Sequence, residues 1–255
     1  MCFDIVLYGY KDKRGDKMNK PSILFIYAHP DDETVYSAGT IAKYAKQGAN
    51  ISLITATCGE KGRTSGECKQ AELADFRRKE LTEVTQKLGV NRTFMLNYPD
   101  GSLSEVPVPE ITAKIAEIIR EVRPDILITF DEDGANGHRD HKAIYTYSTL
   151  AIARAENKDE VQIKGEPYTV EVIYYTDISA EICSYLGLSY KHHDKVTIID
   201  IQEFAKVKFD ALKAHRTQTL SLSPFVGAND RLLPYIFSEE RFFIVDERKG
   251  KYLLR

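Results

Sequence analysis

The 255-residue sequence has no apolar run near the roughly 20 residues that a membrane-spanning helix needs, so we expect no membrane span. Its four cysteines form no CxxC pair, which argues against both a disulfide framework and a sulfur-ligated metal site. An excess of positive charge is also missing: 35 lysines and arginines stand against 38 acidic residues, and the formal net charge is −3, so no basic face is expected for nucleic acid or an anionic membrane. Scattered thiols predict a cytoplasmic protein, and we expect no nucleic-acid or membrane partner.

Glycine is missing from the turn that follows the first apolar run. That turn reads AHPDDETV, and the next glycine is Gly39. A dinucleotide site needs a GxGxxG turn whose glycines let the backbone approach a pyrophosphate, and three carboxylates would repel that group. The sequence also contains no GxxxxGK(S/T) loop, so nucleotide binding is not expected.

The first 17 residues, MCFDIVLYGYKDKRGDK, place their basic residues behind an apolar patch that already contains Asp4. A secretory signal peptide has the reverse order. Met18 offers a second start directly before the first strand-like run. We therefore expect residues 1–17 to be a poorly structured N-terminal extension and residues 18–255 to form one domain with a large core.

Apolar runs of strand length alternate with helical patterns along the chain. Strands are predicted at Ser22–Tyr27, Ile51–Thr57, Thr93–Leu96, Ile126–Phe130, Val170–Thr176, Val196–Ile201 and Phe242–Val245. Helices are predicted at Thr34–Gln47, at Lys69–Leu88, at Pro109–Arg123 and from Gln202 to about His215. A further helix should follow the glycine-containing loop after Phe130 and end near Arg154. Residues 157–169 should be a loop, and residues 216–238 an ordered loop acting as a lid. This order predicts an α/β fold: one Rossmann-like, doubly wound domain with a mostly parallel sheet and helices on both faces.

Two clusters of histidine and aspartate follow two of the predicted strands. The first is Ala28–Glu33, reading AHPDDE, directly after the first strand. The second is Gly137–His141, reading GHRDH, after the strand that ends at Phe130. Ligands of open α/β sheets bind outside the carboxyl ends of the strands, so the two clusters predict one metal site built from distant parts of the chain.

His29 and Asp32 lie three residues apart at a strand-to-helix turn, which brings their side chains to one side. One histidine of the second cluster, His138 or His141, would complete a set of two histidines and a carboxylate. Zinc enzymes use three such ligands and leave a fourth position for water, and Fe(II) accepts the same set. The spacing does not decide which of the two histidines binds the metal.

Asp31 and the remaining histidine are candidates for proton transfer. Asp31 adjoins a ligand and could accept a proton from the attacking water, although an aspartate here could instead cap the following helix. The second histidine, when protonated, could stabilise an oxyanion, and Asp140 could keep its imidazole charged and oriented.

Six motifs stand in the order found in one known family: Ala28–Glu33, Thr57–Gly62, Arg77–Glu80, Pro99–Gly101, His138–His141 and Ala214–Gln218. From about residue 20 to 220 the sequence resembles the PIG-L/LmbE-like family of zinc-dependent N-acetylglucosamine deacetylases. The likeness implies that His141 is the third zinc ligand, beside His29 and Asp32. It also implies that Asp31 is the general base, His138 the acid that stabilises the oxyanion, and Asp140 its orienting partner.

The resemblance further implies substrate contacts at Glu60, Arg77, Asp100 and His215. From the residues alone, Arg77 would be a surface helix arginine and His215 a favourable charge at a helix end. The family usually has proline where this chain has Arg139.

Together these features predict an enzyme that removes the acetyl group of an N-acetylglucosaminyl (GlcNAc) compound with Zn²⁺ or, on the same ligands, Fe²⁺. Its partner would be a small-molecule GlcNAc conjugate, and the resemblance suggests a homo-oligomer. One alternative is a two-metal phosphoesterase, which would need further bridging carboxylates such as Asp177 and Asp200. The other is a non-catalytic sugar-binding module, which would have no use for both Asp31 and His138.

Overall fold

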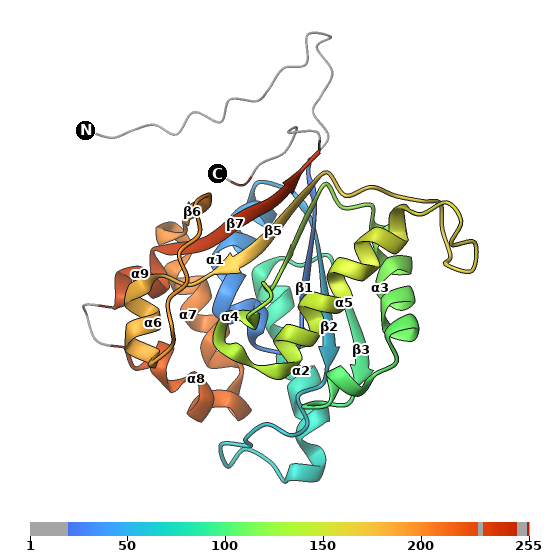
Figure 1. Cartoon of the computed structure of the whole chain (residues 1–255). Helices are drawn as coiled ribbons and strands as arrows, with labels where there is room; N and C mark the ends of the chain where they lie inside the picture. Colours follow the sequence, from blue (N-terminus) through green and yellow to red (C-terminus); the bar gives the residue numbers. More distant parts are fainter. Residues whose placement is uncertain (1–19, 229–231, 249–253, 255) are drawn as a thin grey trace, which may run out of the picture.

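A computed structural model describes residues 20–228, 232–248 and 254, so the expected extension at residues 1–17 lies outside the described residues. Within them, one sheet has the strand order β3-β2-β1-β4-β5-β7-β6 (Figure 1). The strands are β1 Ser22–Tyr27, β2 Asn50–Thr57, β3 Arg92–Tyr98, β4 Ile126–Thr129, β5 Val172–Asp177, β6 Val196–Asp200 and β7 Glu239–Glu247. Strands β1 to β5 pair in parallel, whereas β7 is antiparallel to both of its neighbours, β5 and β6.

The helices lie in two groups on the sheet. They are α1 Asp32–Lys46, α2 Leu73–Leu88, α3 Val108–Val122, α4 Gly134–Gly137, α5 Arg139–Glu156, α6 Ala180–Leu186, α7 Ala205–Ala214, α8 Thr219–Val226 and α9 Leu233–Phe237. Helix α3 packs against α5, while α1 packs against α2 and α7, so the two groups cover opposite faces (Figure 1). The predicted doubly wound, mostly parallel α/β fold is confirmed. No helix among the described residues is long and apolar enough to cross a membrane.

The centre of the sheet lies where the chain reverses its direction of winding. From β1 the chain adds β2 and β3 on one side, and then returns through α3 to place β4 on the other side of β1. Phe25 of β1 pairs with Leu53 of β2 and Ile128 of β4, and all three side chains are fully buried. The loops after β1 and β4 therefore emerge side by side at the carboxyl edge, the usual place for a ligand in such sheets.

The expectation of an ordered loop over residues 216–238 is wrong. This stretch contains the helices α8 and α9, which pack with α6 and α7. Pro224 lies inside α8 and cannot donate a hydrogen bond to the carbonyl of Leu220, which weakens the helical pattern in the sequence. The Ser223 hydroxyl donates to that carbonyl at 2.9 Å and replaces the missing bond.

Helix α6 was not predicted either, because its seven residues are too few for a clear periodic pattern. Its ends nevertheless carry ordinary signals. Ser179 caps the start by accepting a hydrogen bond from the Ile182 amide at 3.3 Å, and Gly187 ends the helix with φ of 69°.

Candidate active site

The two histidine and aspartate clusters meet at the carboxyl ends of β1 and β4, beside a cavity of about 750 Å³. His29, Asp31 and Asp32 reach it from the turn between β1 and α1, and His138 and His141 from the start of α5. Residues more than a hundred positions apart in the chain thus line one cavity.

Four donor atoms of these residues lie close together, because each ring faces a different oxygen of Asp32. His29 Nδ1 lies 3.4 Å from Asp32 Oδ2, His141 Nε2 lies 3.2 Å from Asp32 Oδ1, and the two ring nitrogens are 3.3 Å apart. A tetrahedral zinc ion with ligands at about 2.0–2.1 Å spaces them roughly 3.3–3.4 Å apart. The two ring nitrogens therefore have the spacing of zinc ligands, and Asp32 Oδ1 is the carboxylate oxygen left for a metal, because Oδ2 accepts the Ala28 and His29 amides.

Acceptors behind the two rings direct the nitrogens that would bind the metal. His29 Nε2 lies 3.2 Å from both Asp100 Oδ1 and Asp140 Oδ2, and His141 Nδ1 lies 3.0 Å from the Gly134 carbonyl oxygen. Donation of these rear N–H groups leaves the forward nitrogens as free lone pairs. Ligating histidines in proteins are commonly held in this way.

Asp31 occupies a strained position at the start of α1. Its φ of 116° is rare for a residue other than glycine, and its side chain makes no capping hydrogen bond. The helix-capping alternative for Asp31 therefore lacks support. Burial raises the pKa of the Asp31 carboxyl to about 6, although the Arg77 guanidinium, 3.1 Å away, favours the charged form.

His138 stands over the cavity beside His29, and their ring centroids are 4.8 Å apart. Its Nδ1 accepts a hydrogen bond from the Asp140 amide at 3.2 Å, which leaves Nε2 as the outward nitrogen. Burial lowers the pKa of His138, and the neighbouring His29 and His141 lower it further. The Asp140 carboxylate bonds to His29 and accepts from the Gly101 amide at 2.6 Å, so it acts on His138 through charge and its own amide.

The four expected substrate contacts are divided between the cavity wall and the structure behind it. Asp100 and Arg77 line the cavity, whereas Glu60 and His215 are not among its lining residues. Burial alone would raise the pKa of Asp100, but its bonds to His29 and to the Lys61 amide lower it to about 2. Glu60 accepts a hydrogen bond from the Asp100 amide at 2.8 Å and so shapes the turn that carries Asp100.

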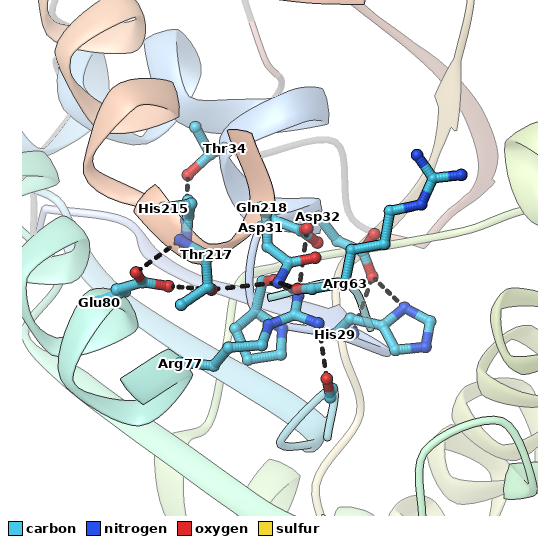
Figure 2. Close-up of polar contacts among 12 residues, drawn as sticks. His29, Asp31, Asp32, Thr34, Arg63, Arg77, Glu80, His215, Thr217 and Gln218 are labelled. Carbon is cyan, nitrogen blue, oxygen red and sulfur yellow. Dashed lines mark hydrogen bonds and ion pairs between the residues drawn. The ribbon is translucent and has the colours of Figure 1, made fainter. Parts of the chain in front are cut away.

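The two terminal nitrogens of the Arg77 guanidinium, Nη1 and Nη2, are directed at the protein. The side chain is 3% exposed and donates to the carbonyl oxygens of Gly59 and Pro30 in addition to pairing with Asp31. Figure 2 shows it reaching from α2 toward Asp31, beneath the first cluster. Its guanidinium therefore acts on the position and charge of Asp31.

Behind the site, the segment that carries His215 and Thr217 bonds to the start of α1 and to Glu80 of α2 (Figure 2). His215 is fully buried, and its Nε2 lies 3.0 Å from Glu33 Oε1 and 3.2 Å from Thr34 Oγ1 at the start of α1. Glu80, one turn after Arg77 on α2, accepts two hydrogen bonds from Thr217, at 2.9 and 2.6 Å. These contacts brace α1 and α2 against each other.

The sequence reasoning missed two aromatic residues of the site. The Phe130 ring stacks on His141 with centroids 4.1 Å apart, and Tyr36 lines the cavity one turn after Asp32. The spacing of four residues between Asp32 and Tyr36 was a usable signal, because such residues share a helix face. Away from the clusters the helices α6, α8 and α9 give the cavity an apolar wall that includes Ile182, Leu222, Phe225 and Ile236.

The carboxylates that a two-metal phosphoesterase would need have other partners. Asp177 lies 2.9 Å from both His193 Nδ1 and Arg241 Nε, and Asp200 is exposed and accepts a hydrogen bond from the Gln202 amide. Neither is bonded to the cluster around His29 within the described ranges, so the geometry does not favour this alternative.

Known proteins resemble this chain in both sequence and structure. Residues 24–152 match the sequence model of the GlcNAc-PI de-N-acetylase family, PIG-L. A 1D-myo-inositol 2-acetamido-2-deoxy-alpha-D-glucopyranoside deacetylase of Rhodococcus jostii is 32% identical, over 92% of this chain and 94% of its own. The N,N'-diacetylchitobiose deacetylase of Pyrococcus horikoshii superposes with a TM-score of 0.70 at 25% identity, covering 88% of this chain and 84% of its own. A conserved protein of Thermus thermophilus shares the fold, with a TM-score of 0.71 at 23% identity, over 92% of this chain and 100% of its own.

Proposed function

Since this chain belongs to the PIG-L family of de-N-acetylases, we propose that it hydrolyses the N-acetyl group of a small-molecule GlcNAc conjugate and releases acetate and the free amine. The observation that carries the proposal is the meeting of His29, Asp32 and His141 donor atoms within 3.4 Å of one another, beside Asp31 and His138. This arrangement joins a metal-ligand set to a candidate base and a candidate acid in one cavity.

Zn²⁺ is the metal that we propose for His29, Asp32 and His141, with Fe²⁺ acceptable to the same ligands. When bound, the ion would lower the pKa of a coordinated water and polarise the amide carbonyl. The forward ring nitrogens and the Asp32 carboxylate suit a divalent cation, because the rear nitrogens of both histidines already face hydrogen-bond acceptors.

Asp31 transfers the proton, and His138 stabilises the oxyanion. Asp31 takes a proton from the water that attacks the acetyl carbon, and its raised pKa suits a base that works near neutral pH. His138 donates a hydrogen bond to the oxygen that gains negative charge. The carbon–nitrogen bond then breaks, and Asp31 returns its proton to the departing amine. Acetate and the glucosamine compound are the products.

The remaining motif residues position this machinery. Arg77 holds the Asp31 carboxylate, and Asp140 orients His29 as well as supporting His138. Asp100, at the cavity wall, is placed to contact the sugar, while Glu60 and His215 act from behind the wall. Three cysteines, Cys58, Cys68 and Cys183, are free thiols, which suits the reducing cytoplasm that we propose as its location. A homo-oligomer is part of the proposal through the family resemblance alone.

The test is acetate release from the purified protein with measured metal content. Protein loaded with Zn²⁺ or Fe²⁺ should release acetate from the inositol conjugate named for the Rhodococcus relative or from diacetylchitobiose, and chelator should abolish the release. His29→Ala is the inactive control. Hydrolysis of phosphate esters without acetate release would favour the phosphoesterase, and sugar binding without turnover would favour the binding module.

A further inference from the structure

We propose that Lys61 and Arg139 bind an anionic group of the substrate, so that the preferred GlcNAc conjugate carries a carboxylate or a phosphate. This inference rests on the proposed deacetylation and adds the substrate class. It concerns residues that neither the metal cluster nor the proton transfers use. Both side chains are exposed and line the mouth of the cavity.

The two cations come from different elements and meet over one glycine. Lys61 follows β2, and Arg139 is the first residue of α5. A Cβ placed on Gly101 would lie 3.3 Å from Arg139 Nη2 and 3.7 Å from Lys61 Cδ, so both side chains pass directly above this residue. The Gly101 amide donates to Asp140, which also bonds to His29. Lys61 and Arg139 therefore lie at the border of the candidate metal site.

These cations differ from the other cations of the cavity in having no acidic partner. Arg77 pairs with Asp31 at 3.1 Å, Lys208 with Glu240 at 2.7 Å, and Arg241 with Asp177 at 2.9 Å. Across residues 20–228 and 232–248, neither Lys61 nor Arg139 forms an ion pair. The Lys61 ammonium only approaches the Ser102 hydroxyl, at 3.4 Å.

The nearby carboxylates are already occupied. Asp100 accepts a hydrogen bond from the Lys61 backbone amide at 2.8 Å and contacts His29, while Asp140 bonds to His29 and to loop amides. Two unneutralised cations side by side, at the positive N-terminus of the 18-residue α5, create a local field that an anion relieves. The planar guanidinium of Arg139 can also bind a carboxylate or phosphate through two parallel hydrogen bonds.

Arg139 is also the position at which this chain departs from the family pattern, because proline usually stands there. Proline is well tolerated at the first position of a helix, so the geometry of α5 does not require arginine there. The side chain is thus free to serve substrate selection, whereas the buried Arg77 is committed to Asp31.

The experiment compares GlcNAc glycosides with small aglycones: glycolate and a methyl phosphodiester, which are anionic, and ethylene glycol, which is neutral. The variants are Lys61→Gln, Arg139→Gln and the double variant, with Arg139→Pro as a second replacement that keeps the helix start. Lys142→Gln is the matched control, because Lys142 is an exposed cation in the first turn of α5 that does not line the cavity.

The double variant should raise KM for the better anionic conjugate about 10- to 100-fold, which corresponds to charge-assisted hydrogen bonds, while kcat changes little. The KM for the neutral conjugate should change far less, and Lys142→Gln should behave like wild type. The comparison of carboxylate with phosphodiester identifies the anion. High ionic strength should weaken the preference of the wild type.

Calorimetric binding of the glycolate conjugate to wild type and double variant gives a readout that does not need turnover. Equal losses on charged and neutral conjugates, or unchanged binding of the anionic ones, would overturn the proposal. Absence of acetate release from every conjugate with wild type would instead defeat the proposed deacetylation, while the calorimetry would still decide the anion site.

Discussion

Arg120 should be among the side chains on which the stability of the fold depends most. It belongs to α3 and lies beside the C-terminus of α5, the end of that helix remote from the active site. The residue is 4% exposed, and the hydrogen bonds of its guanidinium within the described part of the chain go to carbonyl oxygens. It donates hydrogen bonds of 2.6–3.3 Å to six of them, on Arg154, Ala155, Asn157, Glu160, Ile163 and Gly165. One side chain from α3 therefore closes the C-terminus of α5 and orders the loop that follows.

The cost of Arg120→Met follows from these bonds. A hydrogen bond to a charged group contributes about 1.5–3 kcal/mol, but the six are not additive, because water can reach the carbonyls once the loop loosens. We expect a loss of about 3–5 kcal/mol in the free energy of unfolding. At roughly 2–4 °C per kcal/mol for a chain of this size, Tm should fall by roughly 6–20 °C. Arg120→Lys should lie between, since an ammonium keeps the charge but loses the planar fork.

Thermal unfolding by circular dichroism measures the effect, and kcat at 20 °C should stay at the wild-type value. Arg92→Met is the control: its side chain is 45% exposed and pairs with Glu121 on the surface, so its removal should cost less than about 1 kcal/mol. If Arg120→Met melts within about 2 °C of wild type, or if the control loses as much, the reasoning about this buried arginine fails.

Further predictions concern the catalytic cluster. His29→Ala, Asp32→Ala and His141→Ala should each lose most bound metal by elemental analysis, while His138→Ala keeps it; full occupancy in His141→Ala would reverse the assignment of the two histidines. Asp31→Asn should keep metal and fold but lower kcat by about 10²–10⁴-fold, and a value within a few-fold of wild type would remove its role as base. Because Asp31 must be ionised to accept a proton, kcat/KM should rise with pH through its pKa, which burial raises to about 6 and a bound cation would lower. Asp31→Asn should lose this acid limb.

The order of strands and helices was largely predictable because apolar runs and helical periodicity are local properties. The last residues of α1, α2 and α3 fall within one residue of the expected positions, helped by clear signals such as Gly89, with φ of 79°, at the end of α2. The start of α2 is less well predicted, because the helix begins at Leu73 and not at Lys69. Helices α6 and α8 were not predicted, since α6 has only seven residues and α8 contains Pro224. The insertion of β7 between β5 and β6 depends on pairing across the chain, which no local pattern reveals.

The candidate site, too, was predictable where a residue's position depends on nearby sequence, and not where it depends on contacts between distant segments. The sequence placed His29 and His141 near each other because both follow parallel strands, and their nitrogens lie 3.3 Å apart. It could not foresee the partners of Arg77, because a helix arginine between Phe76 and Arg78 can face either solvent or core, and only the approach of Gly59 and Asp31 decides. The tie between His215 and Glu33 likewise joins segments far apart in sequence.

The place of β7 in the sheet has a consequence during synthesis on the ribosome. Within the described sheet β6 has β7 as its single neighbour, so β6 emerges well before the strand that it must pair with. Until residues 239–247 follow, β5 presents an unpaired edge, and the Gly39 and Thr40 amides of α1 lack the Glu240 carboxylate that they bond in the finished fold. A nascent chain halted before residue 239 would hold both metal-ligand clusters beside an open strand edge, the feature that invites pairing with other chains. Stalled translation in this region should therefore yield aggregates that need chaperone protection.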